Sequence, residues 1–128
     1  MLGHRMSDYQ CIELTNREDI AVVRLVDQKV IDPDRIHLLG EELLSLAQGT
    51  DGQRLLINMD NVRFLSSSAI NKLIVLERRV TGAGGKIKLS NLSPEVAEVF
   101  NITQLNSVFD ICDSERDAID SFHGNVES

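Results

Sequence analysis

The stretch FLSSSAIN, residues 64–71, sets three consecutive serines between a segment with the pattern of a strand and one with the pattern of a helix. Upstream, QRLLINM at residues 53–59 is a short apolar run, as expected of a strand covered on both faces. Downstream, apolar residues recur at the spacing of helical turns from Ile70 to Val80, until the glycines of GAGG at residues 82–85. The junction therefore predicts a strand, a short connection and a helix that begins at the serines.

Strand and helix patterns alternate along the rest of the chain as well. We expect further strands at residues 11–14, 20–26, 86–92 and 107–112, the first two paired across the turn-like NRED. We expect further helices in the segments 31–49, 93–100 and 114–122, capped by Asp32, Ser93 and Ser114, with Pro33 and Pro94 at first helical positions and Gly49 as a stop. This order predicts an α/β fold in which helices pack on a largely parallel sheet.

The composition restricts the classes of partner. A length of 128 residues predicts one domain, and a net charge of -7 opposes binding to a phosphate backbone. One Tyr, four Phe and no Trp leave no stacking platform for single-stranded nucleic acid. We therefore expect protein partners and no nucleic acid.

The remaining sequence features point to a protein of the cytoplasm. Cys11 and Cys112 lie far apart in apolar surroundings, which is typical of reduced core thiols rather than of a disulfide or a metal site. No apolar run reaches the roughly 18 residues of a membrane helix, so we expect no membrane partner. Residues 1–8 are expected to be a disordered leader, residues 9–123 a single domain and residues 124–128 a frayed tail.

The local chemistry of the serines supports two interpretations. Ser66 or Ser67 is expected to cap the helix by accepting a hydrogen bond from a free backbone N–H, a role that needs only one serine. A hydroxyl at the start of a helix is also well placed to accept a phosphate, because the free N–H groups and the helix dipole favour an anion there. Residue chemistry alone leaves both interpretations open.

The wider pattern resembles the STAS domain, a family that includes bacterial anti-sigma factor antagonists and the cytoplasmic tail of sulphate transporters. The resemblance runs from about Cys11 to Phe122, and FLSSSAI is its most specific part. It implies a mixed, largely parallel sheet of about five strands packed with about four helices. The serine phosphorylated in such antagonists falls on Ser67. Ser66 stands where the family usually has Asp, and Ala69 where it usually has Gly.

The resemblance implies partner switching without catalysis or a cofactor. The unmodified protein would bind an anti-sigma factor of the histidine-kinase-like ATPase fold, which would phosphorylate Ser67, and a PP2C-type phosphatase would reverse the modification. In this interpretation Ser67 caps the helix on an exposed rim, where an added dianion changes which proteins can dock. The expected partner-binding residues around it are Asn61, Arg63, Ser66, Ser68, Ala69, Asn71 and Lys72.

Three alternatives accompany this hypothesis. A receiver domain would use Asp60 as phosphoacceptor, but Asp27 stands without the second acid that Mg²⁺ needs. A serine hydrolase would need a G-x-S-x-G elbow, which is absent, and a histidine near Ser67, whereas the histidines lie at positions 4, 37 and 123. A STAS scaffold or adaptor that is never phosphorylated is the third alternative, favoured by the departures at Ser66 and Ala69. The sequence leaves open the identity of the sigma factor, the oligomeric state and whether Ser68 replaces Ser67.

Overall fold

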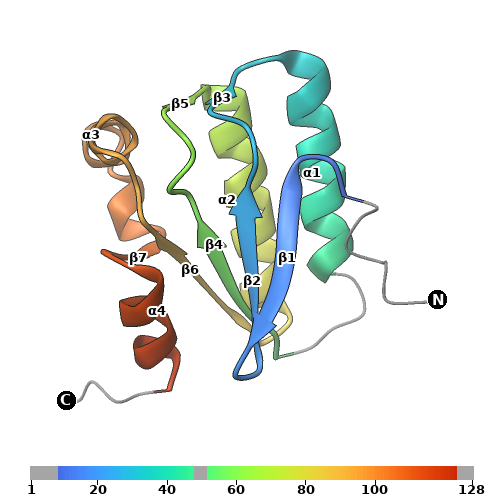
Figure 1. Cartoon of the computed structure of the whole chain (residues 1–128), viewed down its shortest axis with the longest axis vertical. Helices are drawn as coiled ribbons and strands as arrows, with labels where there is room; N and C mark the ends of the chain where they lie inside the picture. Colours follow the sequence, from blue (N-terminus) through green and yellow to red (C-terminus); the bar gives the residue numbers. More distant parts are fainter. Residues whose placement is uncertain (1–8, 48–51, 124–128) are drawn as a thin grey trace.

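The computed structural model describes residues 9–47 and 52–123 and shows one five-stranded sheet (Figure 1). Its strand order is β1-β2-β4-β6-β7, with β1 antiparallel to β2 and the other neighbours parallel. The strands are β1 (Ile12–Arg17), β2 (Ile20–Leu25), β4 (Arg54–Asn58), β6 (Lys86–Ser90) and β7 (Asp110–Cys112). The predicted mixed, largely parallel sheet is confirmed.

Four α-helices lie in the described part of the chain: α1 (Pro33–Ala47), α2 (Ser67–Gly82), α3 (Pro94–Ile102) and α4 (Glu115–Phe122). The predicted caps form at three of them. Asp32 Oδ2 accepts from the Arg35 N–H, and the hydroxyls of Ser93 and Ser114 accept from the third residue of their helices. The expected stop at Gly49, the leader 1–8 and the tail 124–128 lie outside the described residues.

The helices cover the two faces of the sheet unequally (Figure 1). The side chains of β4 alternate between the faces, so Leu55 and Ile57 enter the larger core beneath α1 and α2. Leu56 packs on the other side in a smaller cluster with α4. All three residues are fully buried, which confirms that β4 is covered on both faces. Within the described residues, no helix is long and apolar enough to cross a membrane.

A short parallel ribbon, which the sequence analysis missed, joins the starts of α1 and α2. It pairs β3 (Lys29–Val30) with β5 (Phe64–Leu65), immediately before the two helices. The Phe64 N–H donates to the Gln28 carbonyl at 3.1 Å, and the Ser66 N–H donates to the Val30 carbonyl at 3.1 Å. The ribbon therefore holds both helix starts at the same end of the sheet (Figure 1).

Candidate functional site

Ser66 is the residue that caps α2. Its backbone is extended, with φ -74° and ψ 164°, because its N–H still bonds to the β3–β5 ribbon. Its hydroxyl accepts from the Ala69 N–H at 3.2 Å. Of the two candidate caps, Ser66 is therefore correct, and the expectation that Ser67 caps the helix is wrong.

Ser67 is instead the first residue of α2, with an exposed side chain. The N–H groups of the first helical turn have no acceptor within the helix, apart from the one that Ser66 satisfies. The helix dipole adds a positive partial charge at the same point. An exposed hydroxyl thus lies where the backbone stabilises negative charge.

A hollow of about 310 Å³ opens between the starts of α1 and α2. Its lining residues are Ile31, Pro33, Ile36, His37, Ser66, Ser68 and Lys72. The exposed Ser68 thus faces the same space as Lys72, one helical turn further along α2. This hollow brings Ser66, Ser68 and Lys72, three of the predicted binding residues, together on one side of the helix.

A second hollow of about 200 Å³ continues along the groove between α1 and α2, and Asn71 and Lys72 line it. Asn71 is exposed and Lys72 is half-buried. The stem of Lys72 lies so close to Gly40 of α1 that an added Cβ at Gly40 would sit 2.7 Å from the lysine Cδ. Gly40 therefore allows the lysine to lie across α1.

Ala69 does not belong to the surface. Its side chain is fully buried in the larger core, where it packs beneath the first turn of α2. The prediction that Ala69 contacts a partner is therefore wrong. At the third position of the helix, the methyl group points inward because the N-cap Ser66 fixes the rotation of the first turn.

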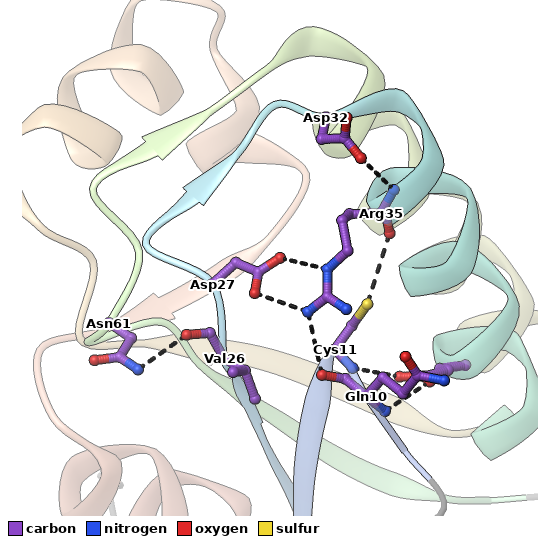
Figure 2. Close-up of polar contacts among 8 residues, drawn as sticks. Gln10, Cys11, Val26, Asp27, Asp32, Arg35 and Asn61 are labelled. Atoms are coloured by element: carbon purple, nitrogen blue, oxygen red, sulfur yellow. Dashed lines mark hydrogen bonds and ion pairs between the residues drawn. The ribbon is translucent and has the colours of Figure 1, made fainter.

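Asn61 and Arg63 lie in the connection between β4 and β5. The Asn61 side-chain amide donates to the Val26 carbonyl at 3.2 Å, which ties this connection to the end of β2 (Figure 2). Arg63 is exposed, and its backbone N–H donates to the Gln28 carbonyl at 2.8 Å. Asn61 thus helps to hold the connection in place, while the Arg63 guanidinium remains on the surface.

A polar cluster beside the site fixes the start of α1 (Figure 2). The guanidinium of Arg35 donates to both carboxylate oxygens of Asp27, at 3.0 and 2.8 Å, and to the Gln10 carbonyl at 3.2 Å. This bond to Asp27 raises the Arg35 pKa further. A bidentate pair fixes orientation as well as distance, so the loop between β2 and β3 is firmly attached to α1.

The two cysteines are free thiols, as predicted. Cys11 is buried and its thiol lies 3.6 Å from the Arg35 carbonyl, whereas Cys112 is half-buried in β7. Burial raises the pKa of both thiols, because the charged thiolate is poorly solvated inside the protein. Both residues therefore have the low reactivity of structural cysteines.

An apolar groove of about 180 Å³ lies on the other side of Ser66, between β5 and α3. We call it the α3 groove; its lining residues are Ile31, Arg63, Phe64, Leu65, Ser66, Glu95, Val96 and Val99. Ile31 is 54% exposed and Phe64 is 52% exposed. Arg63 and Ser66 were predicted as binding residues from the sequence, whereas the apolar members were not, because an apolar residue beside a strand is usually expected in the core.

The described residues do not assemble the chemistry of the two enzyme-like alternatives. Asp60 is half-exposed and pairs with Arg24 at 2.6 Å. His37 lines the same hollow as Ser68, but its Nε2 lies 3.2 Å from a carboxylate oxygen of Glu41. No cluster of metal-binding side chains occurs in the ranges 9–47 and 52–123.

Comparison with known proteins decides the family. The STAS domain family model matches residues 12–118, which is nearly the whole of the described chain. The chain is 32% identical over 81 residues to the anti-sigma-B factor antagonist of Bacillus subtilis, a match that covers 63% of this chain and 72% of that protein. The chain belongs to the STAS domain family of anti-sigma factor antagonists. It is an antagonist-like regulator rather than an enzyme.

Two further similarities support the assignment. A STAS-domain containing protein of Pseudomonas aeruginosa is 32% identical over 59 residues, which is 46% of this chain and 58% of that protein, less than two thirds of its length. The solved structure of an anti-sigma-factor antagonist domain protein from Planctomyces limnophilus superposes with a TM-score of 0.81 at 22% identity. It covers 88% of this chain and 97% of the other, and at this identity it supports the STAS fold alone.

Proposed function

We propose that this STAS protein is a partner-switching regulator controlled by phosphorylation of Ser67. The unmodified protein binds an anti-sigma factor of the histidine-kinase-like ATPase fold in the cytoplasm, and that partner phosphorylates Ser67 with its own ATP. A PP2C-type phosphatase restores the binding form. The observation that carries the proposal is an exposed hydroxyl at the first residue of α2, in a chain of the anti-sigma factor antagonist family.

The three serines differ in what they offer to a kinase. The Ser66 hydroxyl already accepts a hydrogen bond and is half-buried. The Ser68 hydroxyl faces the hollow that Lys72 lines. Ser67 is exposed and has no capping role, so a kinase reaches it without unwinding the helix start.

The departures from the family pattern at Ser66 and Ala69 are compatible with phosphorylation of Ser67. Ser66 in place of Asp removes a negative charge, but both residue types are good helix caps, and Ser66 performs that role here. Ala69 in place of Gly adds a methyl group that is buried in the core, so it meets no partner. The first turn of α2 thus keeps its shape despite both changes.

The switch itself is electrostatic. A phosphate adds about -1.5 to -2 charges at neutral pH, together with three strongly hydrated oxygens. On an exposed residue at a helix start, this group is stabilised by the free N–H groups, so the fold is retained. A partner packed against the same surface would have to desolvate the phosphate, and the complex would dissociate.

The direct test is phosphorylation in vitro. The protein is incubated with an anti-sigma factor kinase encoded beside it and Mg-ATP, and the intact mass is measured. We expect one added phosphate on the wild type and on Ser68→Ala, and none on Ser67→Ala. Modification of Ser67→Ala to the wild-type extent would refute the assignment of Ser67, and Ser67→Asp should weaken binding to the same kinase.

The second candidate function is a STAS adaptor that is never phosphorylated. The α3 groove favours it, since exposed apolar residues such as Ile31 and Phe64 provide a binding surface that needs no phosphate. The same experiment separates the two functions. If the protein is an adaptor, it binds its partner and stays unmodified in Mg-ATP. The Ser67→Asp variant then binds that partner as tightly as the wild type does.

A further inference from the structure

We infer that the α3 groove binds an amphipathic helix of the partner protein whose apolar stripe is flanked by acidic residues. This inference rests on the proposed function for the existence of a protein partner, and it specifies the chemistry of that partner. It concerns the surface between the β3–β5 ribbon and α3, which the docking of a kinase on Ser67 does not by itself require.

Apolar side chains of the groove are exposed to solvent. Ile31 is 54% exposed, Phe64 is 52% exposed and Val99 is 36% exposed, and all three line the same groove. Ile102, 73% exposed, follows Val99 by less than one turn of α3. Contiguous exposed apolar side chains of this kind mark an interaction surface, whereas single ones do not.

The occupant is indicated by the charges on the ribbon side of the groove. The Lys29 ammonium lies 5.8 Å from the centre of the Phe64 ring, and Arg63 lines the groove. Within the described part of the chain, neither cation takes part in an ion pair. Both cations lie on the ribbon side of the groove, and they complement an acidic flank on the occupant.

The opposite wall gives the occupant an orientation. Glu95 lies in the first turn of α3 and is the acidic residue of the groove lining. An acidic flank therefore fits against Lys29 and Arg63 and is kept away from the α3 side, where it would face a like charge. Apolar anchors at helical spacing fit between the two walls, against Phe64 and Val99.

The position of the groove connects this docking to the switch. Ser66 lines both the α3 groove and the hollow between α1 and α2, so Ser67 follows a residue of the groove wall. A phosphate on Ser67 places about -1.5 to -2 charges beside the end of the groove. An acidic occupant is repelled by that charge, whereas a basic occupant would be held more tightly by it. An acidic occupant thus adds charge repulsion to the desolvation cost that already favours release on phosphorylation.

The test uses two synthetic helical peptides and needs no kinase. Both carry leucines at helical spacing; one has glutamates at its other positions and the second has lysines. Each is titrated into the ¹⁵N-labelled full chain, and backbone amide shifts are followed by NMR. We expect saturable shifts at Ile31, Phe64 and Val99 with the glutamate peptide, and binding about tenfold weaker with the lysine peptide. Equal binding of the two peptides, or shifts located elsewhere, would overturn the inference.

Matched variants locate the contact. Phe64→Ala and Arg63→Glu should each lower the affinity for the glutamate peptide by about tenfold. Val108→Ala removes another exposed apolar side chain and Arg78→Glu reverses another exposed charge outside the α3 groove, so both should bind as the wild type does.

A Phe64-dependent dimer in sedimentation would instead assign the groove to a second copy of the chain. If the glutamate peptide does not bind the α3 groove but Ser67 is phosphorylated normally, only the inference about the groove is rejected. If the peptide binds but Ser67 is not phosphorylated, only the assignment of Ser67 as a kinase substrate is rejected.

Discussion

β4 and the serine junction, Ser66–Ser68, are close in sequence but differ in burial. In β4, the three residues from Leu55 to Ile57 have no exposed surface, and each contributes to one of the two cores. At the junction, Ser67 and Ser68 are exposed and Ser66 alone is bonded into the fold through its hydroxyl. β4 therefore contributes mainly to stability, whereas Ser67 and Ser68 place hydroxyls on the surface and contribute little to stability.

The largest expected effect is in β4. Ile57→Ala should lower the free energy of unfolding by about 2 to 5 kcal/mol, because it removes three carbons from the larger core and leaves a cavity. The measurement is urea unfolding followed by circular dichroism. Leu56→Ala is the matched control, because it removes three carbons from the smaller cluster on the α4 face. A loss for Ile57→Ala below about 0.5 kcal/mol would contradict the role of β4 in the larger core.

Ser66 is the point where the two regions overlap, and its replacement should have an intermediate effect. Ser66→Ala removes the acceptor for the Ala69 N–H and should cost about 1 kcal/mol of stability. Ser66→Asp keeps an acceptor and should unfold close to the wild type. Equal stability of Ser66→Ala and the wild type in the same urea experiment would show that the cap has no energetic role.

The thiols of Cys11 and Cys112 make the stability of the fold depend on pH. Burial raises the thiol pKa of Cys11 and Cys112 in the folded state, so on going to alkaline pH the unfolded chain loses these protons first. The folded state then binds more protons than the unfolded state, and stability falls as the pH rises above the ordinary thiol value of about 8.5. We expect the wild type to lose more stability than the Cys11→Ala/Cys112→Ala double variant between about pH 7.5 and about pH 9.5. Equal losses of stability in the two proteins would mean that burial does not raise the pKa of the thiols.

The smallest effect is expected at Ser67. Ser67→Asp should change the free energy of unfolding by less than about 0.5 kcal/mol, because a carboxylate at a helix start is tolerated or stabilising. Ala69→Asp, only two residues along, places the same group in the core and should destabilise the protein severely. Similar melting temperatures for the two variants would show that burial does not distinguish these neighbours.

The elements that were predicted from sequence are those with strong local signals. The apolar run of β4 and the caps at Asp32, Ser93 and Ser114 each correspond to an observed element. The β3–β5 ribbon was missed because each strand has two residues, too few for any periodicity. Glu42 shows another limit: its burial depends on accepting the Gln10 and Cys11 N–H groups, at 2.8 and 2.9 Å, which come from a distant part of the chain.

For the candidate site, sequence located the serine junction but not the role of each residue in it. The choice between Ser66 and Ser67 as cap depends on where the β3–β5 ribbon ends, and the burial of Ala69 follows from that choice. The α3 groove was not predicted because it joins segments far apart in the sequence, one around Phe64 and one around Val99. Local patterns carry no information about such a meeting of distant segments.

The β3–β5 ribbon also constrains how this chain can change over generations. One strand of the ribbon ends the connection from β2 to α1, and the other ends the connection from β4 to α2. A shift of one strand past its partner would also move the start of the attached helix, so an insertion in either connection has to bulge outward before the ribbon. Among descendants of this sequence we therefore expect length changes in these connections to leave the pairing of β3 with β5 in register.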